Sequence, residues 1–231
     1  MLVISHRGYH VSILENTIES FEAAVAMGVD GIETDIRLSA DQVPILCHDH
    51  LTPDGQEVAS LSHAAVATAF GHPIATLEEA LQLPLRGKAE FLWNLEIKVP
   101  TAVDQTVALL EKYRSRTRIL ITSFWHPVIE EVSRRTDVDC GVIVSHRPIA
   151  FDSRPDWLPN RPNVNTVVWY FETVDAALIA RSAECGLHNY VYGVTTPAEH
   201  ARVATWGLDG VITDRPDYVR QGSNLSEPSG H

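Results

Sequence analysis

Two carboxylates in one strand-like segment are the first side chains in the sequence whose types and spacing could do chemistry. In the segment Gly31–Leu38, the alternation of a strand places Glu33, Asp35 and Arg37 on one face. Like charges that are withdrawn from water repel each other, and a divalent cation with oxygen ligands removes that conflict. The pair therefore predicts a metal site, and the alternative is that one carboxylate simply pairs with Arg37.

A third carboxylate lies in a second segment of the same kind. In Phe91–Lys98, alternation places Glu96 and Lys98 on a common face near the end of the segment. The carboxyl ends of barrel strands are where active sites are built. We therefore expect Glu96 to join the first two carboxylates, although a Glu96–Lys98 ion pair at the strand end is an alternative.

Two histidines are candidates for proton transfer. His6 and Arg7 end the first strand-like segment, before a glycine that permits a tight turn. A guanidinium can bind phosphate through two hydrogen bonds, and an imidazole can exchange a proton near neutral pH. His48 follows a later apolar run and offers a second proton carrier, with Asp49 either orienting a ring or capping a turn. The sequence leaves open whether His10 faces a pocket or solvent.

Strands and helices are predicted to alternate along most of the chain, and they must position these side chains. Eight short apolar runs have the character of buried parallel strands, and in a chain of 231 residues they favour a closed (β/α)8 TIM barrel over an open sheet. The predicted strands are Leu2–Ser5, Gly31–Leu38, Phe91–Lys98, Ile119–Phe124, Cys140–Ser145, Asn165–Trp169, Tyr190–Val194 and Gly210–Asp214. The predicted helices are Thr17–Met27, Leu77–Leu83, Ala102–Tyr113, Pro127–Arg135, Val174–Cys185, Pro197–Trp206 and Pro216–Gln221.

Two segments interrupt this alternation. After the second strand, Val43–Cys47 is predicted to be extra extended chain. It is followed by a short insertion at about residues 50–75, with a small helix near His63–Phe70. The proline-rich stretch Pro148–Pro162 is expected to be an irregular loop.

The ends of the chain's elements can also be predicted. Asn16 is expected to cap the first helix, with Glu19 completing a capping box three residues later. Residues 1–221 are expected to form a single barrel domain. The polar segment 222–231 is expected to be a disordered tail.

Composition and charge argue against several classes of partner. The formal net charge of −12 disfavours nucleic acid and anionic membranes, so an anionic substrate would need cations concentrated locally. The three cysteines include no Cys-x-x-Cys pair, which argues against zinc–thiolate chemistry and a disulfide framework. No apolar run reaches the roughly 20 residues that span a bilayer, and the first residues leave no room for a secretory signal. A cytoplasmic protein without stable membrane association is expected.

In combination, the motifs resemble those of the glycerophosphodiester phosphodiesterase family, over residues 4 to about 219. The elements that carry the resemblance are His6-Arg7-Gly8, Glu15-Asn16-Thr17, Glu33-x-Asp35, His48-Asp49, Glu96-x-Lys98 and Thr213-Asp214-x-Pro216. The resemblance implies a (β/α)8 barrel with one divalent cation, Mg²⁺ or Ca²⁺. It also implies hydrolysis of small-molecule glycerophosphodiesters to glycerol 3-phosphate and an alcohol.

The resemblance further implies a catalytic pair and a set of metal ligands. By position, His6 and His48 look like the family's acid–base pair. Glu33, Asp35 and Glu96 look like its metal ligands.

Four more residues correspond to substrate-binding positions of the family. Arg7 looks like its phosphate-binding arginine, and Lys98 is similar to a lysine that lines its site. Glu15 matches a glutamate in the loop after the first strand, and Tyr192 stands where many members have tryptophan. The latter change, together with Leu14 in place of a common proline, leaves the identity of the alcohol open.

Other functions remain compatible with the same residues. A lysophospholipase D would require an exposed apolar lip at the barrel mouth, and the short insertion gives little sign of one. A metal-assisted enolising lyase also places carboxylates on barrel strands, but two histidines and an arginine favour phosphate chemistry. A non-catalytic phosphate-binding barrel would not need both histidines and all three carboxylates.

Overall fold

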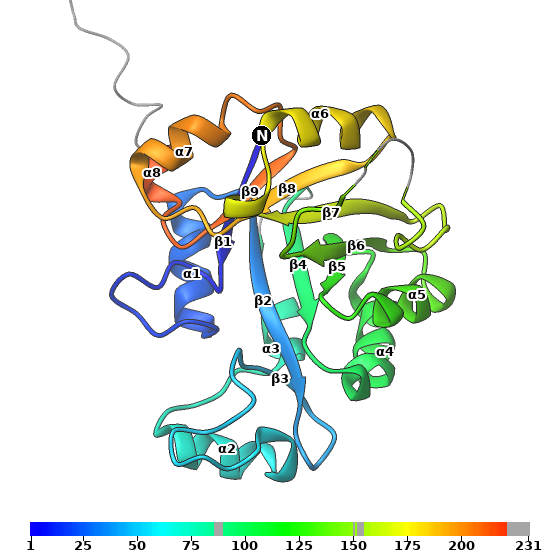
Figure 1. The fold of residues 1–231 in the computed structure, drawn as a ribbon. Coiled ribbons are helices and arrows are strands. Elements are labelled where there is room, and N and C mark those ends of the chain that lie inside the picture. Colours follow the sequence, from blue (N-terminus) through cyan, green and yellow to red (C-terminus); the bar gives the residue numbers. More distant parts are fainter. Residues whose placement is uncertain (86–89, 150, 152–154, 221–231) are drawn as a thin grey trace, which may run out of the picture.

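A computed structural model describes residues 1–85, 90–149, 151 and 155–220, and within them the chain forms the expected parallel barrel (Figure 1). Neighbouring strands pair in parallel, and β1 pairs with both β2 and β9, which closes the sheet. The barrel strands are β1 (Leu2–His6), β2 (Gly31–Leu38), β4 (Leu92–Ile97), β5 (Arg118–Ser123), β6 (Asp139–Val144), β7 (Val164–Tyr170), β8 (His188–Tyr192) and β9 (Gly210–Thr213).

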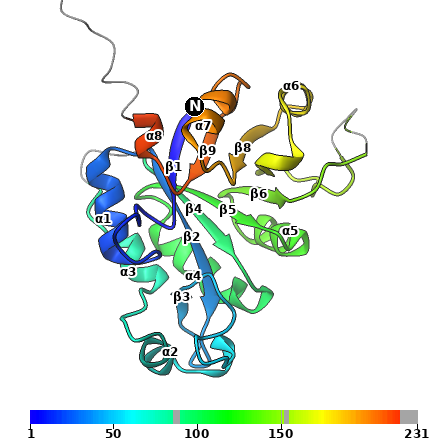
Figure 2. The ribbon, with the colours of Figure 1, turned by 60° about the vertical axis from the view of Figure 1, so that its left-hand side comes forward.

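Helices lie around the outside of the strands (Figures 1 and 2). They are α1 (Ile18–Met27), α3 (Leu77–Leu81), α4 (Val103–Tyr113), α5 (His126–Arg135), α6 (Ala176–Glu184), α7 (Pro197–Val203) and α8 (Asp217–Arg220). Single 3-10 turns precede α4 and α6, at η2 (Pro100–Ala102) and η3 (Phe171–Thr173). Between β6 and β7 the described residues form no helix, as the proline-rich sequence predicts.

None of the helices in the described ranges combines the length and the apolar character needed to cross a bilayer.

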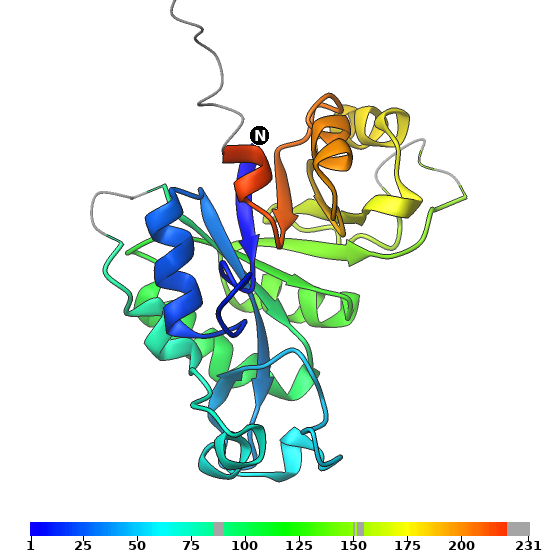
Figure 3. The same cartoon turned by 90° about the vertical axis from the view of Figure 1, so that its left-hand side faces the viewer.

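The interruption after β2 consists of a short strand and a small helix. β3 (Pro44–Leu46) pairs antiparallel with β2, and it is followed by η1 (Val58–Ser60) and α2 (His63–Phe70). Figures 1 and 3 show α2 beyond the carboxyl end of β2, apart from the helices that surround the barrel. The helix predicted here is confirmed, whereas the predicted tail at residues 222–231 lies outside the described residues.

The predicted cap of the first helix is wrong by one residue. Thr17 is the N-cap, and its side chain accepts a hydrogen bond from the backbone N–H of Ser20, which completes the capping box in place of Glu19. Asn16 has a left-handed backbone (φ 55°) and is buried, so its amide points into the barrel instead of toward the helix. Because the cap lies one residue later than predicted, Asn16 does not cap the helix and its side chain is instead available inside the barrel.

Alternation along the strands divides the core into two parts. Outward-facing residues such as Ile32, Ile36 and Trp93 are buried beneath the helices. The barrel interior holds a separate apolar cluster: Ile4, Leu92, Leu120, Ile143, Val168, Tyr190 and Ile212. Inward positions nearer the carboxyl ends of the strands are polar or charged. A site at that end of the barrel would therefore lie directly above the apolar cluster.

Candidate active site

Strand register brings the predicted site residues to one height at the carboxyl end of the barrel. His6 of β1 is paired with Glu33 of β2, and Asp35 of β2 is paired with Glu96 of β4. An open cavity of about 550 Å³, including the solvent at its mouth, lies above them. The predicted site residues that line it are His6, Arg7, Glu33, His48, Glu96, Lys98 and Tyr192.

The three carboxylates form one buried cluster. Glu33, Asp35 and Glu96 each offer an oxygen within 4.8 Å of the others. Burial, followed by repulsion from Asp35, raises the pKa of both Glu33 and Glu96. Glu33 Oε1 is buried and has no hydrogen-bond partner among the described residues. Leaving a buried hydrogen-bond acceptor without a donor is costly. The cluster therefore needs additional positive charge, and its carboxylate oxygens are the ligands that Mg²⁺ and Ca²⁺ prefer.

Asp35 carries the positive partners of the cluster. Arg7 Nε lies 3.0 Å from its Oδ2 and Lys98 Nζ lies 3.2 Å from its Oδ1. Burial alone would raise the pKa of Asp35, but Lys98 and Arg7 outweigh it and hold that pKa below its ordinary value. Asn16 also donates to Oδ2 at 2.9 Å. Asp35 is therefore the carboxylate of the cluster that is already held as an anion.

The two ion pairs considered as alternatives have different outcomes. Lys98 Nζ does lie 2.7 Å from Glu96 Oε1, so the strand-end pair exists. Among the described residues, no lysine or arginine side chain forms an ion pair with Glu33, whose Oε2 lies 3.7 Å from Nε2 of His6. Arg37 instead donates to the backbone carbonyl of His48, from Nε at 2.9 Å and Nη2 at 2.7 Å. The alternative in which Arg37 pairs with one of the carboxylates is therefore not what the described residues show.

Arg7 is positioned by its backbone and by Glu15. It has a left-handed φ of 54°, and its N–H donates to the carbonyl of Glu33 at 2.8 Å. Its Nη1 donates to both oxygens of Glu15, at 2.9 and 3.1 Å. Glu15 thus reaches the site through Arg7 and does not line the cavity itself.

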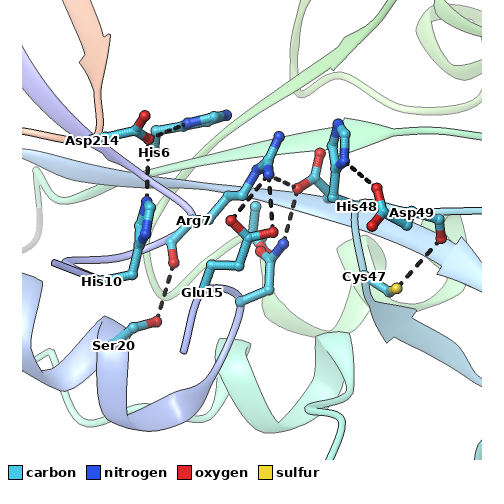
Figure 4. A network of polar contacts seen from close by, with 12 residues as sticks. His6, Arg7, His10, Glu15, Ser20, Cys47, His48, Asp49 and Asp214 are labelled. Atoms are coloured by element: carbon cyan, nitrogen blue, oxygen red, sulfur yellow. Dashed lines mark hydrogen bonds and ion pairs between the residues drawn. The ribbon is translucent and has the colours of Figure 1, made fainter. Parts of the chain in front are cut away.

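His6 shares a carboxylate with His10 (Figure 4). The Nδ1 of His6 lies 2.5 Å from Asp214 Oδ1, and the Nε2 of His10 lies 3.1 Å from the same oxygen. Burial would raise the pKa of Asp214, but hydrogen bonds with His10 and His6 hold it well below its ordinary value. No role was predicted for Asp214, although β1 and β9 pair at Ser5 and Thr213, the residues immediately before His6 and Asp214.

His48 stands on the other side of Arg7 in Figure 4. Its Nδ1 lies 2.8 Å from Asp49 Oδ1, so Asp49 contacts the ring, which was one of its two predicted roles. The neighbouring Cys47 is buried, and burial raises the pKa of its thiol to about 11. Cys47 is therefore expected to be an unreactive thiol.

Aromatic and aliphatic side chains line the other half of the cavity. The rings of Phe124 and Tyr192 pack edge to face, with centroids 6.2 Å apart, and Lys98 Nζ lies 5.8 Å from the centroid of Phe124. Burial raises the pKa of Tyr192 to about 12, so its hydroxyl stays protonated. The role of Phe124 was not predicted from the sequence, although it directly follows β5. The cavity therefore joins a charged side to an apolar side.

Comparison with known proteins agrees with this architecture. Residues 6–218 match the glycerophosphoryl diester phosphodiesterase family. The chain is 26% identical to a glycerophosphodiester phosphodiesterase of Caldanaerobacter subterraneus, covering 96% of this chain and 98% of that protein. It is 31% identical to the Mycobacterium tuberculosis protein named probable glycerophosphodiester phosphodiesterase 2, over 95% and 89%. An Oleispira antarctica phosphodiesterase solved with the product sn-glycerol-3-phosphate has the same fold, with a TM-score of 0.81, 21% identity and coverage of 98% and 97%.

Proposed function

The chain belongs to the glycerophosphoryl diester phosphodiesterase family and is thus a phosphoric diester hydrolase, and we propose that it cleaves glycerophosphodiesters to glycerol 3-phosphate and an alcohol in a metal-dependent reaction. The proposal rests on one observation: a buried cluster of three carboxylates lies in the same cavity as His6 and His48. The product bound to the Oleispira relative is consistent with this substrate class.

Glu33, Asp35 and Glu96 would hold the cation. Bound there, Mg²⁺ or Ca²⁺ supplies Lewis-acid stabilisation of negative charge on the phosphoryl group. The orphaned Oε1 of Glu33 supports this assignment, because a cation would satisfy it. Arg7 and Lys98 line the same cavity and offer N–H donors to phosphate oxygens, which answers the need for local cations in an acidic protein.

The two histidines would move the protons of the reaction. One ring accepts a proton from the attacking oxygen, of water or of the neighbouring hydroxyl of the substrate, as that oxygen bonds to phosphorus. If the hydroxyl attacks, water must afterwards open the cyclic phosphate to give glycerol 3-phosphate. The other ring donates a proton to the alcohol oxygen as its bond to phosphorus breaks. Asp214 and Asp49 each contact the Nδ1 of one ring, so the Nε2 of His6 and of His48 are the atoms left for this exchange.

Alanine substitutions test the histidine pair. We expect His6→Ala and His48→Ala each to lower kcat by about 10²- to 10⁴-fold, the usual contribution of general acid–base catalysis. Mg²⁺ affinity, measured by calorimetry, should stay near the wild-type value, because neither ring is among the proposed ligands. His188→Ala is the matched control, since His188 begins β8 at the opposite end of the barrel and should leave kcat unchanged. Normal turnover in either site variant would refute the pairing.

A second candidate, a lysophospholipase D-type activity, is favoured by exposed apolar residues in the loops that follow several strands, of which Phe124 lines the cavity. Large apolar side chains are exposed in loops that follow β1, β3, β5 and β6: Val11, Leu14, Leu51, Phe124, Trp125 and Ile149. Such residues at the mouth could contact an acyl chain. If so, the enzyme hydrolyses lysophosphatidylcholine, and Trp125→Ala lowers kcat/KM for this lipid several-fold but leaves glycerophosphocholine unaffected. Absence of lysolipid hydrolysis would exclude this candidate.

A further inference from the structure

A second group of possible metal ligands lies beside the carboxylate cluster and shares His6 with the catalytic machinery. It consists of His6, His10 and Asp214, whose ligand atoms lie within 4.8 Å of one another. All three side chains are reachable from solvent, with exposed fractions of 27%, 20% and 50%. Figure 4 shows Asp214 between the two rings.

The fold itself assembles this group. Parallel pairing of β1 with β9 places Asp214 next to His6, although the two are 208 residues apart in the chain. After β1 the chain turns sharply through two left-handed residues, Arg7 (φ 54°) and Gly8 (φ 80°). That turn brings His10 back to the same carboxylate oxygen from the other side. The three residues are thus fixed by strand register and by a tight turn.

The ligand types differ from those of the carboxylate cluster. Two imidazole nitrogens and one carboxylate suit Zn²⁺ and related transition metals, whereas three carboxylates suit Mg²⁺ or Ca²⁺. Tetrahedral zinc ligands lie about 2.0–2.2 Å from the metal and hence roughly 3.3 Å from each other. The contacts of Asp214 Oδ1 with His6 Nδ1 (2.5 Å) and His10 Nε2 (3.1 Å) need only small side-chain rotations to open to that spacing.

We propose that His6, His10 and Asp214 form a transition-metal site, and that Zn²⁺ bound there inhibits the enzyme. A metal on Nδ1 of His6 takes the place of the hydrogen bond with Asp214 and leaves the ring with its remaining proton on Nε2. Nε2 can then donate a proton but has no lone pair to accept one. Since the Nε2 of His6 faces the cavity, 3.7 Å from Glu33 Oε2, a ring held in this state cannot complete a cycle of proton transfer.

Direct metal binding tests the site independently of catalysis. Zn²⁺ affinity is measured by competition with a chelating dye, in millimolar Mg²⁺ so that the carboxylate cluster is saturated. We expect one Zn²⁺ site in the wild type, and a loss of about 10- to 100-fold or more in affinity in His10→Gln. His72→Gln, which removes a partly exposed histidine outside the group, should bind Zn²⁺ as the wild type does.

The second measurement is inhibition of phosphodiesterase activity by Zn²⁺. Unlike the binding measurement, it rests on the proposed function. Zn²⁺ should inhibit the wild type and His72→Gln at the same concentration. His10→Gln should keep its basal turnover within about twofold and resist at least tenfold more Zn²⁺. Equal inhibition of His10→Gln, or no saturable Zn²⁺ binding to the wild type in Mg²⁺, overturns the proposal. If no phosphodiesterase activity were found at all, the binding measurement would still decide the metal site.

Discussion

At the level of single residues, Glu33 is expected to destabilise the metal-free protein while serving as a metal ligand. It is buried beside Asp35 and Glu96, and repulsion and burial both disfavour its charged form. Without a cation, a neutral amide should be accommodated better. We therefore expect Glu33→Gln to raise the free energy of unfolding in EDTA at pH 8 by about 1 kcal/mol, the scale of gains seen when a strained site is relieved. Mg²⁺ should raise the Tm of the wild type but barely change that of the variant.

Thermal melts with and without Mg²⁺ provide the measurement for both proteins. Glu22→Gln is a suitable control, because Glu22 is exposed on α1 and its loss changes the net charge by the same amount. A Glu33→Gln variant whose Tm rises in Mg²⁺ as much as that of the wild type would remove Glu33 from the ligands.

Sequence alternation could predict those site residues whose neighbours in the site lie on the same strand or on the next strand of the barrel. Glu33, Asp35 and Glu96 were identified because alternation along a strand is a local property. The contacts of Asp214 with His6 and His10 depend on barrel closure between the first and last strands, which spacing in the sequence does not encode. Contacts of that kind become visible only once the register is known.

At the level of elements, the turn between β1 and α1 determines where Arg7 and His6 point. A Cβ on Gly8 would lie 2.4 Å from Ser20 Oγ and 2.7 Å from the Ser20 carbonyl carbon, and the residue has a left-handed φ of 80°. Backbone atoms cannot move aside cheaply. We expect Gly8→Ala to displace the turn, to lower kcat/KM at least 100-fold and to destabilise the protein by about 2–3 kcal/mol.

Gly28, at the end of α1, provides a control that separates the effect of backbone strain from the effect of displacing the turn. It has the same left-handed conformation (φ 83°), but a Cβ there would meet nothing within 4 Å. Gly28→Ala should therefore destabilise the protein by about 1 kcal/mol and leave kcat/KM unchanged. Both variants are compared by urea denaturation and steady-state kinetics. Wild-type activity in Gly8→Ala would show that the turn does not position the site.

Element ends were predicted less accurately than element types, for a physical reason. The capping box predicted at Asn16 was formed one residue later by Thr17 and Ser20, because both asparagine and threonine are good caps. What decides between them is a tertiary contact: Asn16 accepts a hydrogen bond from Thr34 and donates one to Asp35, both on β2. Local preference alone cannot rank two adjacent caps.

At the level of the whole molecule, the parallel barrel was predictable because a helix or a loop returns the chain from each barrel strand to the start of the next. Only after β2 does an extra strand, β3, come before the helices that lead to β4. Closure followed from the number of strands and was confirmed by the pairing of β1 with β9. The small cluster of Ile45, Val58 and Val66 beneath α2 could not be predicted, since the insertion has no regular period.

The net charge of −12 makes a further prediction that belongs to the molecule as a whole. An anionic diester approaches against a repulsive field, and salt screens that field, with a screening length of about 30 Å at 0.01 M and about 8 Å at 0.15 M. We expect kcat/KM for glycerophosphoglycerol to rise about two- to threefold between 10 and 150 mM NaCl at saturating Mg²⁺. Zwitterionic glycerophosphocholine, with no net charge, should change little and serves as the control. A fall in kcat/KM for the anionic diester would mean that the field at the cavity mouth is attractive and that Arg7, Lys98 and the bound cation outweigh the acidic surface.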